Sequence, residues 1–169
     1  MRLLVILSLL CLSACTSLPS GIEPVKSFEL PRYLGTWYEI ARLDHSFERG
    51  LSQVTAEYQM REDGGVKVTN RGFSEKEQVF DSAEGKAYFV GGDDIGHLKV
   101  SFFGPFYGAY VIYELDQDNY QYAFITSYNR DYLWFLSRTP TVSDALKQQF
   151  SEQAKQLGFA TDEIIWVTQ

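Results

Sequence analysis

Short stretches in which apolar and polar residues alternate recur along most of this chain. Alternation with a period of two sends successive side chains to opposite faces of a β-strand. In one such stretch, Val54, Ala56 and Tyr58 alternate with Thr55 and Glu57. The pattern predicts eight strands, over residues 36–43, 54–60, 66–73, 78–90, 97–103, 109–115, 120–128 and 131–138.

The segments between these strands are short and carry turn-forming residues. Residues 62–65 and 116–119 are typical of hairpin turns, and residues 91–94 of a loop. Because the connections are short, strands that follow one another in the sequence should pair as antiparallel neighbours. We therefore expect an all-β fold, an eight-stranded antiparallel up-and-down β-barrel with its apolar face inside. A sandwich whose apolar faces meet and leave no cavity is the alternative.

A helical period replaces the strand period after the eighth strand. Four apolar residues follow at spacings of four, four and three, as on one face of a helix: Leu146, Phe150, Ala154 and Leu157. Thr141 with Asp144 three residues later indicates a capping box at the start of this helix, and Gly158 indicates its end. We expect the helix to pack outside the barrel and residues 163–168 to form a short final strand.

The first residues predict a signal peptide. Arg2 precedes the apolar run 3–12, and two small residues at 13–14 precede Cys15. Signal peptides have this order of a charged residue, a short apolar run and a small-residue cleavage site. The run is too short to span a membrane, so we expect it to be cleaved off before Cys15.

Residues 12–15, Leu-Ser-Ala-Cys, resemble the bacterial lipobox, in which the cysteine becomes the N-terminus and carries a diacylglyceryl group. The resemblance implies lipidation of Cys15, and Thr16 after it implies sorting to the outer membrane of a Gram-negative bacterium, with the domain facing the periplasm. Acyl chains stabilise such attachment by about 0.8 kcal/mol per buried methylene. Ordinary secretory cleavage is the alternative. The predicted organisation is a signal peptide over 1–14, a lipidated N-terminus and tether over 15–28, and a barrel domain over 29–169.

Charge and composition exclude one class of partner. The chain has 169 residues, with 15 Lys and Arg against 22 Asp and Glu and a formal net charge of −7. Nucleic-acid binding needs clustered Lys and Arg, so we expect no nucleic-acid partner. Aromatic residues make up 15% of the chain, which supports a strand-rich fold.

Few residues offer catalytic or metal chemistry. The histidines are His45 and His97, and both cysteines lie within or directly after the signal peptide. The sequence has no Gly-x-Ser-x-Gly motif and no phosphate-binding glycine loop. We therefore expect no metal, no cofactor and no enzymatic activity. Glu39 is the one carboxylate of interest: either it receives a polar group of a ligand, or neighbouring Tyr or Arg side chains satisfy it.

Short motifs give the chain a family resemblance. Gly35 and Trp37 open the first strand, Tyr132 lies at the start of the last barrel strand, and Arg138 lies at its end. Together they resemble the lipocalin family, in which the tryptophan closes one end of the barrel and the arginine packs across it. A guanidinium over an indole contributes about 0.5–2 kcal/mol. Longer stretches resemble the bacterial outer-membrane lipoprotein branch of that family: 44–50, 70–72, 84–89 and 100–108.

This resemblance implies non-covalent binding of a fatty acid or a phospholipid, including a lysophospholipid, for lipid storage, transport or repair in the cell envelope. A mostly apolar cavity suits an acyl chain, because each buried methylene contributes about 0.8 kcal/mol. A structural envelope lipoprotein, a binder of another small hydrophobic ligand and a lipid-modifying enzyme are the alternatives. The inward strand positions predict the lining, with plain core packing as the alternative for each residue: Ala41, Val54, Ala56, Tyr58, Val68, Phe89, Val100, Phe102, Tyr113, Phe124 and Trp134.

Two further features bear on how a ligand would reach the barrel. The loop 103–107 carries three aromatic residues, and four interpretations remain open for it: a lip for lipid uptake, a membrane contact, a homodimer surface, or a loop folded back over the barrel end. Four cations are candidates to meet a phosphate head group at the rim: Arg42, Arg49, Lys86 and Arg130.

Overall fold

The computed structural model describes residues 16–169, so the predicted signal peptide and Cys15 lie outside the described residues. No helix in this described part is long and apolar enough to cross a membrane. The elements follow in the order α1 (Leu30–Tyr33), β1 (Gly35–Arg42), β2 (Leu51–Met60), β3 (Val66–Ser74), β4 (Val79–Phe89), β5 (His97–Ser101), β6 (Gly108–Leu115), β7 (Tyr122–Thr126), β8 (Leu133–Ser137), α2 (Asp144–Gln156), a 3-10 helix (Thr161–Glu163) and β9 (Ile165–Trp166).

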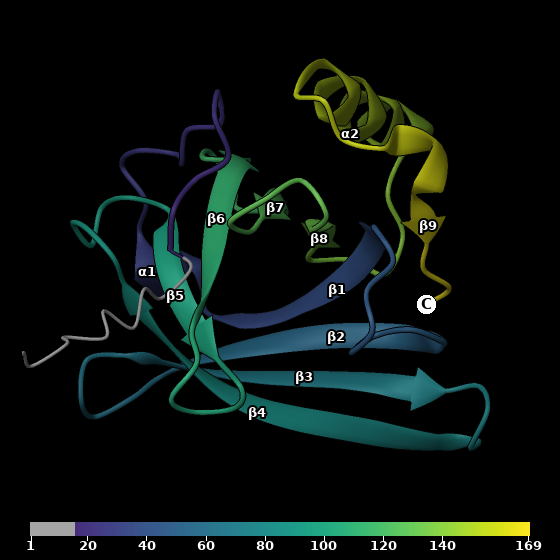
Figure 1. The fold of residues 1–169 in the computed structure, drawn as a ribbon, viewed down its shortest axis with the longest axis horizontal. Coiled ribbons are helices and arrows are strands. Elements are labelled where there is room, and N and C mark those ends of the chain that lie inside the picture. The colour runs from purple at the N-terminus through teal and green to yellow at the C-terminus, as the bar shows by residue number, and fades with distance from the viewer. Residues whose placement is uncertain (1–15) are drawn as a thin grey trace, which may run out of the picture.

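Eight of the strands close into an antiparallel barrel (Figure 1). Each of them pairs with its neighbours in the sequence, and β1 pairs with both β2 and β8, which closes the ring. The predicted up-and-down barrel is therefore confirmed, and the sandwich alternative is wrong. α2 lies outside the barrel, as predicted, and β9 adds to the outside of β1 through Ala41 and Arg42.

Some element boundaries differ from the prediction. Strands β5, β7 and β8 are shorter than expected, and the short helix α1 was not predicted. The residue that caps α2 is Ser143, whose Oγ accepts a hydrogen bond from the backbone N–H of Leu146 at 3.2 Å, so the capping box predicted from Thr141 is wrong. The helix ends before Gly158, as predicted, because this residue adopts the left-handed conformation at φ +82°.

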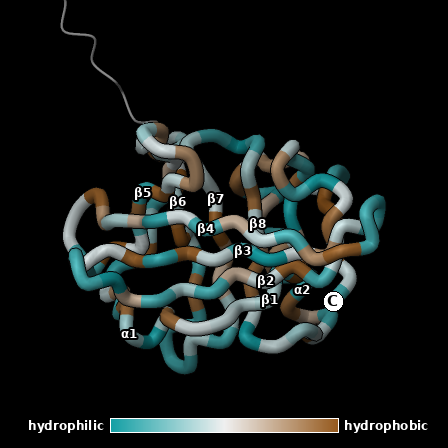
Figure 2. The backbone as a smooth tube through the Cα atoms, turned by 90° about the horizontal axis from the view of Figure 1, so that it is seen from below, coloured by the Kyte–Doolittle hydropathy of each residue, from teal (hydrophilic) through white to brown (hydrophobic). Residues whose placement is uncertain are grey.

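Two apolar clusters lie on opposite sides of the strands. The inner cluster includes Trp37, Val68 and Ile125 and fills part of the barrel interior. The outer cluster joins the outward faces of β1, β7 and β8 to α2, with Phe150 of the helix packed against Phe135 at a centroid distance of 5.1 Å. Figure 2 shows the resulting alternation of hydrophobic and hydrophilic positions along the strands. Some strands therefore have a buried residue on each face.

A β-bulge in β1 reverses the alternation within that strand. The pairing with β8 shifts between Glu39, which lies opposite Leu136 of the inner cluster, and Ala41, which lies opposite Phe135 of the outer cluster. One extra residue on a bulged strand moves every later side chain to the other face. The inward placement predicted for Ala41 is therefore wrong, since this residue lies beneath α2.

Two aromatic residues of β6 and β7 also face outward, contrary to the prediction. Ile112 belongs to the inner cluster, whereas Tyr113 packs on the outer cluster, stacked against Phe159 at a centroid distance of 6.2 Å. Phe124 of β7 also lies in the outer cluster, against the helix. The inward placements predicted for Tyr113 and Phe124 are wrong because both faces of β6 and β7 carry apolar or aromatic residues, so alternation alone does not say which face is inside. The bulge in β6 lies between Ile112 and Glu114 and changes the facing only of later residues.

Part of the predicted tether packs on the barrel. The N–H of Val25 donates to the carbonyl of Ile112 at 2.9 Å, and its carbonyl accepts from Gly96 at 2.9 Å. Phe28 is buried, with its ring 5.2 Å from that of Tyr33. The folded part of the chain therefore begins before residue 29.

Trp37 closes one end of the barrel, which is the arrangement that the lipocalin resemblance implies. Its ring is fully buried, and the Arg138 guanidinium lies 4.0 Å from the ring centroid. Gly35 adopts φ +92°, and a side chain there would also approach Nη1 of Arg138 to 3.4 Å. The same guanidinium donates to four backbone carbonyls, those of Arg32, Leu34, Thr36 and Tyr120.

Replacing Arg138 with Met tests this closure. The change removes the cation from the indole and leaves the four carbonyls without their donor, so we expect the free energy of unfolding in urea to fall by about 2–4 kcal/mol. Arg49→Met is the control, because it removes only an exposed ion pair with Asp44 and should leave stability nearly unchanged. Equal stability of the Arg138→Met and wild-type proteins would show that the closure does not depend on this cation.

Candidate functional site

A cavity of about 680 Å³ occupies the interior of the barrel. Its wall is mostly apolar, with contributions from β2, β3, β5 and β8 that include Val54, Val68, Leu98 and Leu136. Small-molecule sites in proteins commonly measure about 300–1,000 Å³, so the cavity is large enough for a ligand. The interior of the barrel is therefore the candidate site.

Seven of the eleven predicted lining residues face this cavity: Val54, Ala56, Tyr58, Val68, Val100, Phe102 and Trp134. Phe89 faces the interior but lies away from the cavity wall, where Phe28 covers it at a centroid distance of 6.1 Å. The prediction missed this cover because it assigned Phe28 to the tether. Ala41, Tyr113 and Phe124 belong to the outer cluster, as described above. Contact with a ligand stays a prediction for all of these residues.

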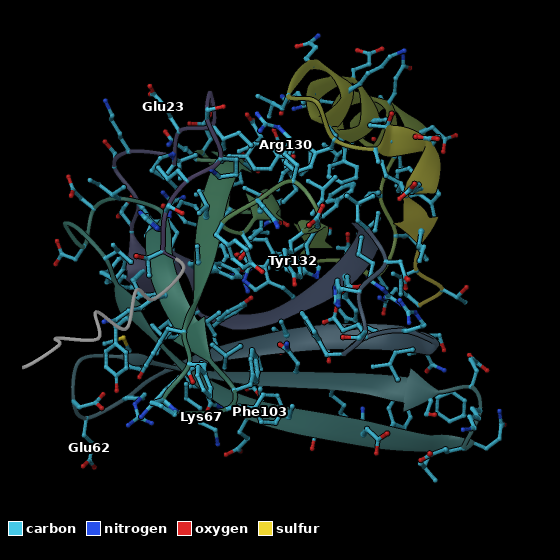
Figure 3. All side chains as sticks on the ribbon, in the orientation of Figure 1. Glu23, Glu62, Lys67, Phe103, Arg130 and Tyr132 are labelled. Atoms are coloured by element: carbon cyan, nitrogen blue, oxygen red, sulfur yellow. The ribbon has the colours of Figure 1, made fainter. Side chains whose placement is uncertain are left out.

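Exposed aromatic side chains border the open end of the cavity. Phe103, Phe106 and Phe47 are 77%, 72% and 57% exposed, yet all three belong to the cavity lining. Figure 3 shows Phe103 on the loop that joins β5 to β6, and Tyr132 within the ring of strands. The exposure of Phe103 and Phe106 contradicts a loop folded back over the barrel end. Roles for this loop in membrane contact or in a homodimer stay predictions.

Glu39 in the cavity wall forms a buried pair with Arg42, which lies behind the wall. Arg42 Nη1 donates to Glu39 Oε1 at 2.6 Å, and Arg42 Nη2 donates to the carbonyls of Glu48 and Leu51 at 2.9 and 3.1 Å. Residues three apart on a regular strand face opposite sides, so the bulge in β1 is what brings Glu39 and Arg42 together. This contact supports the interpretation in which an arginine satisfies Glu39.

A second carboxylate, Glu48, extends this pair into a network. Its Oε2 lies 2.8 Å from Nε2 of His45 and accepts a hydrogen bond from Nε1 of Trp134 at 3.0 Å. Burial opposes ionisation of Glu48, but His45, Trp134 and Arg42 outweigh it and hold the pKa of this carboxyl below its usual range. Burial, reinforced by the charge of Glu48, raises the pKa of Glu39 well above its usual range. Of the two carboxyls, Glu39 is therefore the first to take up a proton as the pH falls.

Three tyrosine hydroxyls meet in the cavity near Trp37. The hydroxyl oxygen of Tyr110 lies 2.8 Å from that of Tyr33 and 2.7 Å from that of Tyr58. The ring of Tyr33 lies 4.7 Å from that of Trp37, which places this cluster at the closed end. Desolvation raises the pKa of each phenol above its ordinary value, so all three are neutral at physiological pH.

The sequence reasoning missed Glu48, Tyr33 and Tyr110 as cavity residues. Glu48 lies in a loop, where no alternation shows which way a side chain faces. Tyr110 lies in β6, whose two faces both carry apolar or aromatic residues, so alternation does not show which face is inside. Tyr33 belongs to α1. Pro31 at the start of that helix was a usable signal, because proline is favoured at the first helical position.

None of the four candidate phosphate-binding cations belongs to the described cavity lining. Arg42 pairs with Glu39, and Arg49 pairs with Asp44 at the surface. Arg130 Nε donates to the carbonyl of Leu157 at 2.6 Å, and its Nη2 donates to the carbonyl of Ser20 at 2.6 Å. Arg130 therefore holds the end of α2 and the N-terminal segment together. Within residues 16–169, no group of three His, Cys, Asp or Glu side chains is arranged to hold a metal ion.

The raised pKa of Glu39 predicts how stability changes with pH. Above the ordinary glutamate pKa of 4.5, the unfolded chain releases a proton that the folded protein still holds, so rising pH reduces the contribution of Glu39 to stability. Glu39→Gln stays neutral, so its free energy of unfolding should fall less than that of the wild type between about pH 5 and pH 8. Urea unfolding at several pH values measures this. The Glu57→Gln variant is the control, because Glu57 is only half-buried and does not line the cavity. Parallel pH profiles for wild type and Glu39→Gln would contradict the assignment.

Known proteins are similar in sequence to this chain over most of its length and most of theirs. A family model described as a lipocalin-like domain matches residues 28–169. The outer membrane lipoprotein Blc of Vibrio cholerae is 58% identical over 164 residues, which cover 97% of this chain and 96% of that protein. The outer membrane lipoprotein Blc of Escherichia coli K12 is 51% identical over 158 residues, which cover 92% and 89% of the two chains.

Solved structures share the fold at much lower sequence identity. The allergen Per a 4 from cockroaches superposes with a TM-score of 0.69 at 20% identity, covering 91% of this chain and 96% of the allergen. Insecticyanin from the tobacco hornworm Manduca sexta superposes with a TM-score of 0.69 at 19% identity, covering 90% and 87%. With its closed barrel, its outer helix and a family match that runs to its last residue, this chain belongs to the lipocalin family.

Proposed function

We propose that this protein binds a fatty acid or a lysophospholipid non-covalently inside the barrel and stores or transports it in the cell envelope. The observation that carries the proposal is the 680 Å³ cavity, which is mostly apolar and opens between exposed Phe47, Phe103 and Phe106. An acyl chain inside it would leave water at a gain of about 0.8 kcal/mol per methylene. The opening leaves room for a polar head group.

The proposed location is the outer membrane, with the barrel in the periplasm. The relatives from Vibrio cholerae and Escherichia coli are named outer membrane lipoproteins, and Cys15 lies in a segment that resembles a lipobox. Lipid on Cys15 would hold the protein at a surface that also contains its proposed ligands.

The polar groups of the cavity favour a carrier over a lipid-modifying enzyme. General acid or base catalysis needs a side chain that can exchange a proton with the substrate. Glu39 is paired with Arg42, and Glu48 with His45 and Trp134, so the contacts of both carboxylates are largely made within the protein. The size and opening of the cavity also disfavour a purely structural lipoprotein, whose barrel could be filled by side chains.

Calorimetric titration with palmitate and with palmitoyl lysophosphatidylcholine tests the carrier proposal. We expect both lipids to bind the wild-type protein after its lipids have been removed. Val100→Trp places a large ring in the cavity wall and should lower affinity at least about tenfold by excluding two or more methylenes. Val90→Trp, at an exposed position outside the cavity, should leave affinity unchanged.

Two results would count against the proposal. If neither lipid bound the wild-type protein, the carrier function would be wrong. If both bound equally well to the wild type and to a folded Val100→Trp protein, the lipid would occupy a site other than the barrel interior.

A further inference from the structure

The hydroxyls of Tyr33, Tyr58 and Tyr110 form a cluster that the proposed acyl-chain site does not require. Each lies on the wall of the cavity, and Tyr33 and Tyr58 are nearly fully buried. Leu98 and Ala87 of the same inner cluster provide apolar surroundings. Phenylalanine at the three positions would fill the same space, so the hydroxyls call for a separate explanation.

Counting hydrogen atoms shows that this tyrosine cluster has one donor without a well-formed hydrogen bond. Three hydroxyls carry three hydrogens, while the cluster has two contacts, Tyr33 to Tyr110 and Tyr58 to Tyr110. Each contact uses one hydrogen. Tyr33 and Tyr58 also interact through their hydroxyls, but only the two contacts to Tyr110 have good hydrogen-bond geometry. The third hydrogen therefore has only this weaker partner, and its O–H can turn to an acceptor in the cavity.

A cation lies behind the tyrosine cluster, because the Arg138 guanidinium packs on Trp37, which in turn packs on Tyr33. The buried carboxylates of Glu39 and Glu48 also line the cavity and act electrostatically on Tyr58, but their hydrogen-bond partners are Arg42, His45 and Trp134 rather than the tyrosine hydroxyls. Burial keeps the phenols protonated, so they remain donors across the physiological pH range.

We propose that the tyrosine cluster is a polar recognition site for an acceptor oxygen at the buried end of the ligand's hydrocarbon chain. The inference rests on the proposed function and narrows its ligand class. Two kinds of lipid carry such an oxygen to this depth: a free fatty acid that enters carboxylate first, and an amphiphile whose chain ends in a hydroxyl or carbonyl group. An unmodified lysophospholipid that enters tail first brings only a methyl group to these donors.

Three probes distinguish these sources. They are palmitate, palmitoyl lysophosphatidylcholine, and the same lysophosphatidylcholine with a hydroxyl on the last carbon of its chain. Each is titrated calorimetrically into the wild type, into the triple variant Tyr33→Phe/Tyr58→Phe/Tyr110→Phe, and into Tyr38→Phe. The triple variant removes all three hydroxyls together, so no buried polar group loses its partner. Tyr38→Phe is a matched control because Tyr38 packs on the outer cluster and does not line the cavity.

The wild-type comparison does not depend on how the triple variant folds. A terminal hydroxyl buried without a partner would weaken binding by about tenfold or more relative to the plain chain. We expect the hydroxylated lysophosphatidylcholine to bind the wild type at least as tightly as the plain one. We expect the triple variant to bind the hydroxylated lipid, palmitate, or both about tenfold more weakly than the wild type, and to bind the plain lysophosphatidylcholine with unchanged affinity. We expect the Tyr38→Phe protein to bind all three lipids with wild-type affinity.

A loss confined to palmitate supports a fatty acid that enters carboxylate first, and a loss confined to the hydroxylated lipid supports an oxygenated chain end. The inference is overturned if the triple variant binds all three lipids as the wild type does, or weakens all three equally. If the triple variant does not fold, the wild-type comparison decides: the inference is overturned if the wild type binds the hydroxylated lysophosphatidylcholine tenfold more weakly than the plain one. Binding of none of the lipids to the wild type would instead overturn the proposed function on which it rests.

Discussion

The contact between Arg138 and Trp37 is the interaction on which the interior of this barrel depends. The planar guanidinium covers the indole, while its N–H groups reach carbonyls of α1, of β1 and of the turn between β6 and β7. One side chain at the end of β8 thus joins the consecutive elements α1 and β1 to the distant turn between β6 and β7 and closes this end of the barrel. The cavity beyond Trp37 opens at the other end, between exposed Phe47, Phe103 and Phe106.

The number of strands, their order and the outer helix could be predicted because each depends on a local period and on short connections. The facing of individual residues could not always be predicted, since a bulge is decided by the hydrogen bonding of two strands together. Ala41 shows the consequence: it follows the bulge in β1, so it joins the outer cluster although alternation places it inside. Phe124 shows a second limit, because β7 has no bulge there but carries apolar residues on both faces. The apolar character of a strand residue does not say which of two cores it joins.

The same limit applies to the polar site. Glu39 was recognised as a buried carboxylate, but its partner Arg42 lies three residues away, a spacing that places two side chains on opposite faces of a regular strand. Tyr33 and Glu48 come from a short helix and a loop, where no alternation exists to be read. The sequence therefore predicts the apolar wall of the cavity better than the polar groups set into it, because apolar residues follow the strand period and these polar groups do not.

The hydrogen bond from Arg130 to the carbonyl of Ser20 sets the length of the connection to the membrane. Ser20 lies five residues after Cys15, and five residues span at most about 17 Å when fully extended. If Cys15 carries lipid, this short tether therefore holds the barrel close to the bilayer. The barrel then cannot turn freely above the membrane surface. Because such a short tether permits few orientations, its attachment point at Ser20 would determine which side of the protein faces the lipid surface.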